Sequence, residues 1–289
     1  MSVAFCGLEL AHRVLNGSGT WDAIAAREVF GEGFALPFAA FVSKTITVEP
    51  RPGNPPHRLW ETPAGMINSI GLPNRGLAGY LEHDLPRLAK ILGSSAPLIT
   101  NVMGSSADQF AALLEGLAGR PEIAAFELNV SCPNVKTGLD IGAHPAELGR
   151  LVARVRSLTP KPLIVKLTPN TADVPAVARA AEAAGADALS LINTLRALPD
   201  GRRGWLGGGT GGLSGPAIRP IALAQVAAVA ESVSLPVIGM GGIASGADAR
   251  EFLDAGATLV AVGTESFRDP AAGTRVAAEL ETISPQIAG

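Results

Sequence analysis

Residues 162–193 read PLIVKLTPNTADVPAVARAAEAAGADALSLIN, and this stretch decides the fold. It opens with an almost continuous apolar run at 162–168, which is typical of a strand covered on both faces of a sheet. An alanine-rich helical pattern follows at 173–184, and Gly185 stands where a helix C-cap favours glycine. A second apolar run at 188–193 completes a strand–helix–strand unit with parallel strands.

The same alternation extends along the chain in both directions. Short apolar runs, each expected to form a parallel strand, lie at 13–17, 39–47, 97–103, 125–131, 162–168, 188–193, 236–240 and 258–263. Helical patterns lie at 76–92, 107–118, 145–157, 173–184, 218–232, 246–255 and 270–281. This rhythm over 289 residues predicts an α/β fold, a (β/α)8 TIM barrel, although the periodicity also permits an open doubly wound sheet. We expect one domain over 1–289, with a short N-terminal extension and inserted loops at the C-terminal face.

Composition narrows the class of protein. A hydrophobic fraction of 47% with 17% charged residues supports a sizeable core, and a net charge of -3 offers no basic excess for nucleic acid. The N-terminus has no secretory-signal pattern, and no apolar run approaches the roughly 18 residues of a membrane span. We therefore expect a cytoplasmic protein. Two cysteines, Cys6 and Cys132, and four scattered histidines favour neither a disulfide framework nor a metal site.

Polar residues and glycines gather where the expected strands end. In a TIM barrel, functional residues lie at the C-terminal ends of the strands, so this placement predicts a site there. The residues concerned are Asn16 to Gly19, Lys44, Thr45, Asn101, Asn129, Cys132, Lys166, Asn193, Thr194, Gly241, Gly242, Gly263 and Thr264.

Three glycine loops favour a phosphate site. Backbone N–H groups after the seventh and eighth barrel strands often hold phosphate, and the loops here are 239–243, 263–264 and 212–215. For any one loop, a tight turn explains the glycines equally well. The stretch from Gly239 to Ala244 also resembles a dinucleotide fingerprint, but too little chain follows for a Rossmann unit, so we do not expect this chain to bind NAD itself.

Other strand-end residues suit an anionic, amide-bearing ligand. Lys44 and Lys166 would place cations there, whereas the structural alternative is lysines whose amines reach solvent at the rim. Asparagines at 68, 129, 134 and 193 match the alternating carbonyl and N–H groups of a cyclic amide, although any single one could be a turn residue. Cys132, in a polar loop, can serve as a general base, whereas Cys6 is expected to be structural.

Several motifs then resemble the family-1 dihydroorotate dehydrogenases over essentially the whole chain. They are Phe41-Val42-Ser43-Lys44-Thr45, Asn68-Ser69-Ile70-Gly71-Leu72-Pro73-Asn74, Glu127-Leu128-Asn129-Val130-Ser131-Cys132-Pro133-Asn134 and Val165-Lys166-Leu167-Thr168-Pro169-Asn170. The resemblance implies a single FMN-binding TIM-barrel domain that oxidises (S)-dihydroorotate to orotate in pyrimidine biosynthesis. It also implies that Cys132 abstracts the C5 proton while hydride passes from C6 to flavin N5.

The resemblance further implies a role for each matching position. The substrate-binding residues would be Lys44, Asn68, Ser69, Ile70, Gly71, Leu72, Asn129, Asn193 and Thr194. The FMN-binding residues would be Ser18, Gly19, Lys44, Thr45, Asn101, Asn129, Lys166, Ile192, Gly215, Gly241, Gly242, Gly263 and Thr264.

Residues 54–66 are similar to subfamily 1B, whose members pass electrons to NAD⁺ through a partner subunit carrying FAD and a 2Fe–2S cluster. The resemblance thus implies a homodimer core that pairs with such a subunit. The loop at 195–209 and Leu139 depart from the 1B pattern. The alternatives are a self-sufficient, fumarate-using enzyme of the 1A type, a non-flavin TIM-barrel enzyme with a phosphorylated substrate, and a binding protein that keeps the fold but not the catalysis.

Overall fold

The computed structural model describes residues 2–130, 138–199, 201 and 204–283. Eight parallel strands form one sheet, in the order β3-β14-β13-β10-β9-β8-β7-β4. They are β3 (Val14–Asn16), β4 (Phe41–Val42), β7 (Leu98–Val102), β8 (Ile123–Asn129), β9 (Leu163–Lys166), β10 (Ala188–Leu191), β13 (Val237–Met240) and β14 (Leu259–Val262). Each lies within or overlaps one of the eight apolar runs, so the TIM-barrel prediction is confirmed.

The seam between the first and last strands of this sheet, β3 and β4, is joined mainly by the side chain of Asn16. No backbone ladder pairs the two strands. Instead the fully buried Asn16 donates from Nδ2 to the Val42 carbonyl oxygen, and its Oδ1 accepts from the Val42 N–H, both at 2.8 Å. One backbone bond, from Ala39 N to Val14 O at 3.0 Å, completes the seam. The amide of Asn16 thus replaces a strand residue and closes the barrel.

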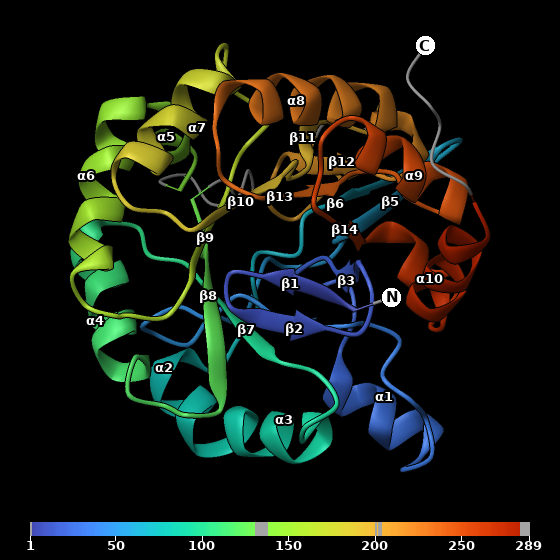
Figure 1. Cartoon of the computed structure of the whole chain (residues 1–289), viewed down its shortest axis with the longest axis horizontal. Coiled ribbons are helices and arrows are strands. Elements are labelled where there is room, and N and C mark those ends of the chain that lie inside the picture. Colours follow the sequence, from blue (N-terminus) through green and yellow to red (C-terminus); the bar gives the residue numbers. More distant parts are fainter. Residues whose placement is uncertain (1, 131–137, 200, 202–203, 284–289) are drawn as a thin grey trace.

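Helices surround the barrel (Figure 1). They are α1 (Ala23–Phe30), α2 (Gly76–Gly79), α3 (Leu85–Leu92), α4 (Ala107–Leu117), α5 (Gly138–Ala143), α6 (Pro145–Arg156), α7 (Val174–Ala183), α8 (Arg219–Ser232), α9 (Gly246–Asp254) and α10 (Ala272–Thr282). A π-helical turn, Tyr80–Asp84, joins α2 to α3, and short 3₁₀ turns lie at Pro216–Ile218 and Thr264–Phe267. The Ser245 hydroxyl caps α9 by accepting from Asp248 N.

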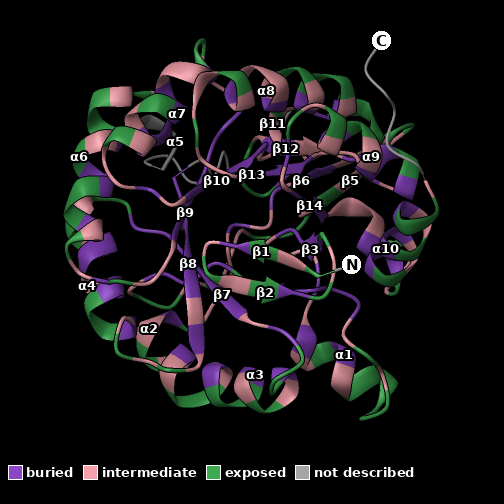
Figure 2. Cartoon of the chain, in the orientation of Figure 1, coloured by how far each residue is buried: buried purple, intermediate pink, exposed green. Residues whose placement is uncertain are grey.

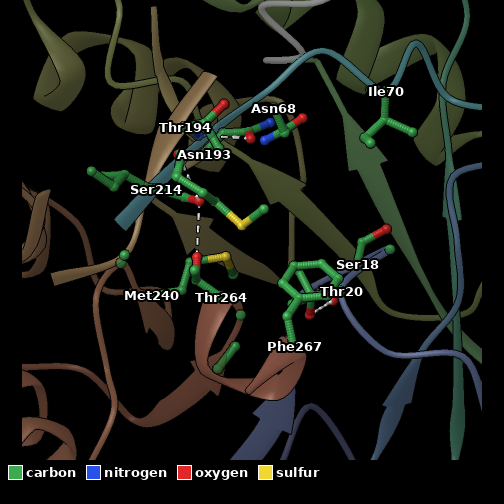
Figure 3. A pocket seen from close by; sticks show the side chains of 18 of the residues that line it. Ser18, Thr20, Asn68, Ile70, Asn193, Thr194, Ser214, Met240, Thr264 and Phe267 are labelled. Atoms are coloured by element: carbon green, nitrogen blue, oxygen red, sulfur yellow. Dashed lines mark hydrogen bonds between the residues drawn. The ribbon is translucent and has the colours of Figure 1, made fainter. Parts of the chain in front are cut away.

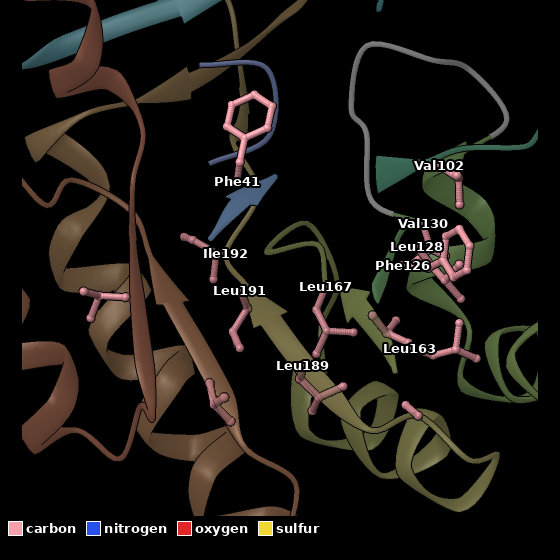
Figure 4. Packing of buried hydrophobic residues seen from close by; sticks show 14 of the residues in the cluster. Phe41, Val102, Phe126, Leu128, Val130, Leu163, Leu167, Leu189, Leu191 and Ile192 are labelled. Carbon is pink, nitrogen blue, oxygen red and sulfur yellow. The ribbon is translucent and has the colours of Figure 1, made fainter. Parts of the chain in front are cut away.

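Most of the apolar core lies between the strands and these helices. Buried side chains of β8, β9 and β10, such as Phe126, Leu163 and Leu189, belong to one cluster with residues of the surrounding helices (Figure 4). The helices are exposed on the outside and buried toward the barrel (Figure 2). None of the helices in the described part of the chain is long and apolar enough to cross a membrane.

A hairpin of β1 (Val3–Phe5) and β2 (Leu8–Leu10) lies across one end of the barrel (Figure 1). Phe5 and Leu10 belong to the same buried cluster as barrel-interior residues such as Ile164 and Ile238, so the hairpin closes this end. Cys6 stands at its turn and donates from Sγ to the Asp187 carbonyl oxygen, at 3.4 Å. Asp187 precedes β10, so Cys6 lies at the N-terminal end of the strands, away from the expected site.

The segments inserted at the other end of the barrel contain strands of their own. Strands β5 (Leu59–Thr62), β6 (Gly65–Asn68), β11 (Leu195–Ala197) and β12 (Gly211–Ser214) form a second, antiparallel sheet in the order β11-β12-β6-β5. Residues 65–68 thereby pair with residues 211–214, far away in sequence. This sheet brings Asn68 and Ser214 to the edge of the barrel mouth.

Candidate active site

A cavity of about 360 Å³ opens at the C-terminal ends of the barrel strands. It brings together most of the residues expected from the sequence. These are Ser18, Gly19, Lys44, Thr45, Asn68, Ile70, Leu72, Asn129, Lys166, Ile192, Asn193, Thr194, Gly215, Gly241, Gly242, Gly263 and Thr264. Figure 3 shows Asn68, Asn193 and Thr194 grouped in one part of the cavity and Ser18, Thr20 and Phe267 in another.

Four of the expected residues are not part of the described cavity lining. The buried hydroxyl of Ser69 donates to the Thr210 carbonyl oxygen at 3.0 Å and accepts from Asn54 Nδ2, so it links inserted segments outside the cavity. Gly71 is also absent from the lining: its φ of +79° permits the turn, and a Cβ there would lie 2.5 Å from Asn54 N. Asn101 is fully buried behind the lining. Cys132 lies outside the described residues.

Lysine 44 lies between this cavity and a neighbouring one of about 370 Å³. Its Nζ is 2.6 Å from Asp22 Oδ2, while Asp22 Oδ1 accepts from the N–H groups of Ile24 and Ala25 and caps α1. Burial acts to raise the pKa of Asp22, but hydrogen bonds from Lys44 and the helix backbone outweigh it and lower the pKa. The lysine cation is therefore held by a fixed carboxylate, which the sequence analysis did not single out.

Lysine 166 differs from Lys44 in being 6% exposed. No hydrogen bond or ion pair joins its ammonium group to another described residue. A buried cation without a partner is costly, so this lysine suits a ligand that carries or acquires negative charge.

Two buried asparagine oxygens at the strand ends also lack partners among the described residues: Oδ1 of Asn101 and Oδ1 of Asn129. The Nδ2 group of Asn101 donates to Glu127, and the Nδ2 group of Asn129 donates to Thr45 Oγ1 at 3.2 Å. A buried oxygen left without a donor costs about 1–3 kcal/mol. Of the two asparagines only Asn129 lines the cavity, so its oxygen suits a ligand with N–H groups.

Glu127 is a polar core residue that sequence reasoning missed. Its side chain is 2% exposed and accepts hydrogen bonds from Asn101 Nδ2 and, at 2.7 Å, from Ser190 Oγ. By taking the Asn101 N–H, the carboxylate fixes which end of that amide remains unpaired. A charged residue inside an apolar strand, at 123–129, was the available signal.

The glycine loops meet at one side of the cavity. The Thr264 hydroxyl donates to Ser214 Oγ at 2.8 Å, which joins the segment after β14 to β12 (Figure 3). Packing alone disfavours a side chain at several of the glycines: for example, a Cβ on Gly241 would lie 2.7 Å from Ala222 Cβ, and one on Gly242 would lie 2.8 Å from Gly215 O. The tight-turn explanation therefore accounts for Gly241 and Gly242 without a ligand.

Gly263 is different. An added Cβ would meet only Thr20 Cγ2, at 3.6 Å, although the backbone itself, with φ −113° and ψ −96°, lies outside the regions that residues with a Cβ favour. Because Gly263 lines the cavity, its missing side chain leaves room that the fold itself does not use. Lys166, which has no partner among the described residues, the Asn129 oxygen and this glycine together fit an anionic ligand with N–H groups, and a flavin is such a ligand.

Apolar side chains complete the lining: Leu59, Met66, Met240, Ala261 and Phe267. Sequence reasoning missed them because nothing local separates a cavity methionine from a core one. Among the described residues, no group of three or more His, Cys, Asp or Glu residues could hold a metal ion.

Comparison with known proteins agrees with this geometry. The family model for dihydroorotate dehydrogenase matches residues 1–283. The chain is 48% identical to the catalytic subunit of dihydroorotate dehydrogenase B (NAD(+)) of Desulforudis audaxviator (strain MP104C), over 97% of this chain and 91% of that protein. Proteins of the same name from Pelobacter propionicus and Geobacter sulfurreducens are 45% and 46% identical, each over 97% of this chain and 92% of their own length. The chain belongs to the dihydroorotate dehydrogenase family.

Proposed function

We propose that this chain is an FMN-dependent dihydroorotate dehydrogenase that oxidises (S)-dihydroorotate to orotate in pyrimidine biosynthesis. The observation that carries the proposal is Lys166, a buried cation that no other described residue pairs with, beside the Asn129 amide oxygen, which also lacks a partner in the described part of the chain. Both residues lie at the ends of barrel strands, and the similar proteins are named as dihydroorotate dehydrogenases.

The cavity residues would divide between cofactor and substrate. Ser18, Thr45, Lys166 and the glycine loops would hold FMN, and the asparagines with Lys44 would hold the carboxylate and ring amides of the substrate. When bound, FMN accepts the two electrons and the C6 hydrogen that dihydroorotate loses. Lys166 then compensates the negative charge that reduction brings into the site. Cys132 removes the C5 proton, so that the C5–C6 double bond forms.

The electrons must then leave this chain. The relatives' name includes NAD(+) and describes a catalytic subunit, which implies a second subunit. The described residues after the glycine fingerprint form α9, β14 and α10 of the barrel. We propose that a homodimer of this chain pairs with a subunit carrying FAD and a 2Fe–2S cluster. That subunit would pass the electrons to NAD⁺.

The test is a visible spectrum followed by an acceptor assay. The purified chain should be yellow, and dihydroorotate should bleach it without oxygen, near one equivalent per flavin. The isolated chain should reduce artificial dyes but use NAD⁺ poorly, and adding a flavin and iron–sulfur subunit should restore NAD⁺ reduction. Brisk fumarate reduction would instead indicate the 1A type, and brisk NAD⁺ reduction by the chain alone would exclude the partner. A folded chain that cannot be reconstituted with FMN would overturn the proposal.

Gly263 allows a second test that separates binding from folding. In Gly263→Ala the new methyl group would occupy cavity space reserved for the cofactor, while its nearest protein atom is 3.6 Å away. We expect FMN affinity of the apoprotein to fall by about tenfold or more, equivalent to about 1.4 kcal/mol. Because the backbone conformation at Gly263 disfavours a residue with a Cβ, the apoprotein should also lose about 1–3 kcal/mol of stability, so FMN affinity is measured at a temperature where the apoprotein stays folded.

The matched control is Gly33→Ala, in an exposed loop where an added Cβ meets no atom within 4 Å. Its FMN affinity, measured by quenching of flavin fluorescence, should equal that of the unmodified chain. Equal affinity in Gly263→Ala as well would show that this glycine does not adjoin the cofactor.

A further inference from the structure

The two loops with the glycines of the proposed phosphate cradle are both held by α10. One loop follows β13 and contains Gly241 and Gly242, and the other follows β14 and contains Gly263 and Thr264. Figure 1 shows α9 and α10 next to each other on the side of the barrel where β14 lies. The contacts between helix and loops centre on one side chain, Arg275.

The guanidinium group of Arg275 bridges the two loops. Nη1 donates to the Ala244 carbonyl oxygen, in the loop after β13, at 2.9 Å. Nε donates to Asp269 Oδ2 at 2.9 Å, and Nη2 donates to Glu265 Oε1 at 3.2 Å, both after β14. The planar fork thus joins one backbone carbonyl and two carboxylates in a single geometry.

Neighbouring carboxylates complete this arrangement. Glu279, one turn further along α10 and 3.3 Å from Arg275 Nη1, accepts from Gly246 N at 2.6 Å. Asp248 accepts from Ala244 N at 2.9 Å. Both backbone polar groups of Ala244 are therefore bound by side chains from two different helices. This leaves the loop after β13 little freedom beside Gly241 and Gly242.

The pKa directions agree with the contacts. The hydrogen bond to Asp269 is the largest cause that raises the pKa of Arg275. The N–H of Gly246 is the largest cause that lowers the pKa of Glu279. Exposed ion pairs contribute little to stability one at a time, and Arg275 is 37% exposed. The consequence of this cluster therefore concerns the placement of the loops more than the stability of the barrel.

We propose that Arg275 is a positioning residue for the phosphate of the cofactor, acting through the loops after β13 and β14. It sets how far the N–H groups of Gly241 and Gly242 lie from those of Gly263 and Thr264, although it touches none of these residues itself. It also offsets the charges of Glu265, Asp269 and Glu279, which would otherwise repel a phosphate dianion. The inference rests on the proposed FMN function and adds the means by which the chain recognises the phosphate.

The test compares FMN with riboflavin, which has the same ring but no phosphate. Apoprotein of the full chain would be titrated with each ligand, with flavin fluorescence as the readout. The unmodified chain should bind FMN more tightly than riboflavin. In Arg275→Met the FMN affinity should fall by about tenfold or more, corresponding to the loss of a charge-assisted network, while riboflavin affinity stays within about twofold.

Two further variants make the comparison decisive. Arg275→Lys keeps the charge but cannot reach both loops, so it should lose part of the FMN affinity and leave the riboflavin affinity unchanged. If Arg275→Met does not fold, Arg275→Lys takes its place in the comparison. Arg154→Met, which removes an exposed ion pair with Asp108 on the other side of the barrel, should change neither affinity.

The results that would overturn the proposed function differ from those that would overturn the role of Arg275. If the unmodified chain binds FMN and riboflavin equally, or binds neither, the phosphate cradle of the proposed function is wrong. If the unmodified chain prefers FMN and Arg275→Met keeps that preference, the positioning role is overturned. Equal weakening of both ligands by Arg275→Met would also overturn it, because that result indicates general destabilisation.

Discussion

Cys132→Ala is expected to lower the turnover of dihydroorotate by about 10²–10⁴-fold, the usual contribution of a general base. The reason is that the C5 proton of the substrate would have no acceptor. FMN content and orotate affinity should stay close to those of the unmodified chain, because the cavity residues hold both without the thiol. Steady-state rates with an artificial dye and the flavin spectrum measure the two quantities separately.

Cys132→Ser should also be slow, since a serine hydroxyl is a weak base in a site suited to a thiol. Cys6→Ala is the matched control. Burial, and then the nearby Asp187 carboxylate, raise the pKa of Cys6 to about 11, so it holds little thiolate at neutral pH. It also lies at the other end of the barrel, and its loss should leave turnover unchanged. Normal turnover in Cys132→Ala would require another base.

Asn16→Leu is expected to destabilise the protein by about 2–6 kcal/mol, because each buried backbone group left unpaired costs about 1–3 kcal/mol. The substitution introduces an apolar side chain of similar size and leaves both the N–H and the carbonyl of Val42 without partners at the seam. Urea unfolding followed by circular dichroism would measure the loss. Gln109→Ala, which removes the two exposed hydrogen bonds that Gln109 Oε1 accepts from Ser105 N and Oγ, should cost less than about 1.5 kcal/mol.

The variant Asn16→Asp tests the same seam through pH. Its carboxylate could still accept from the Val42 N–H, but its second oxygen would face the Val42 carbonyl and repel it. Burial and this carbonyl should raise the pKa of the new carboxyl in the folded state above its unfolded value of about 3.9. Because the folded state then binds more protons, the deficit relative to the unmodified chain should shrink as pH falls from 7 toward 4. A deficit that does not vary with pH would contradict this account of the seam.

The sequence predicted the barrel and the position of the site for one shared reason. Continuous apolar runs such as 162–168 mark strands buried on both faces, and parallel strands bring all their carboxyl ends to one face. Residues as far apart as Lys44, Asn129, Lys166 and Gly263 could therefore be assigned to one cavity from their places after strands. The family motifs then added the individual roles.

Contacts between distant segments were decided only by the tertiary structure. Nothing near Asn16 indicates that its amide would replace a backbone ladder with Val42, nor that Glu127 would orient Asn101. The small sheet pairs Gly65–Asn68 with Gly211–Ser214, and each segment alone is too short and too polar to predict as a strand. Arg275 likewise looks like a surface helix residue until the loops after β13 and β14 lie beside it. The hydrophobic periodicity of a sequence indicates which face of a helix or strand is buried. A side-chain hydrogen bond depends instead on which partner the fold brings within about 3 Å, and that partner can come from anywhere in the chain.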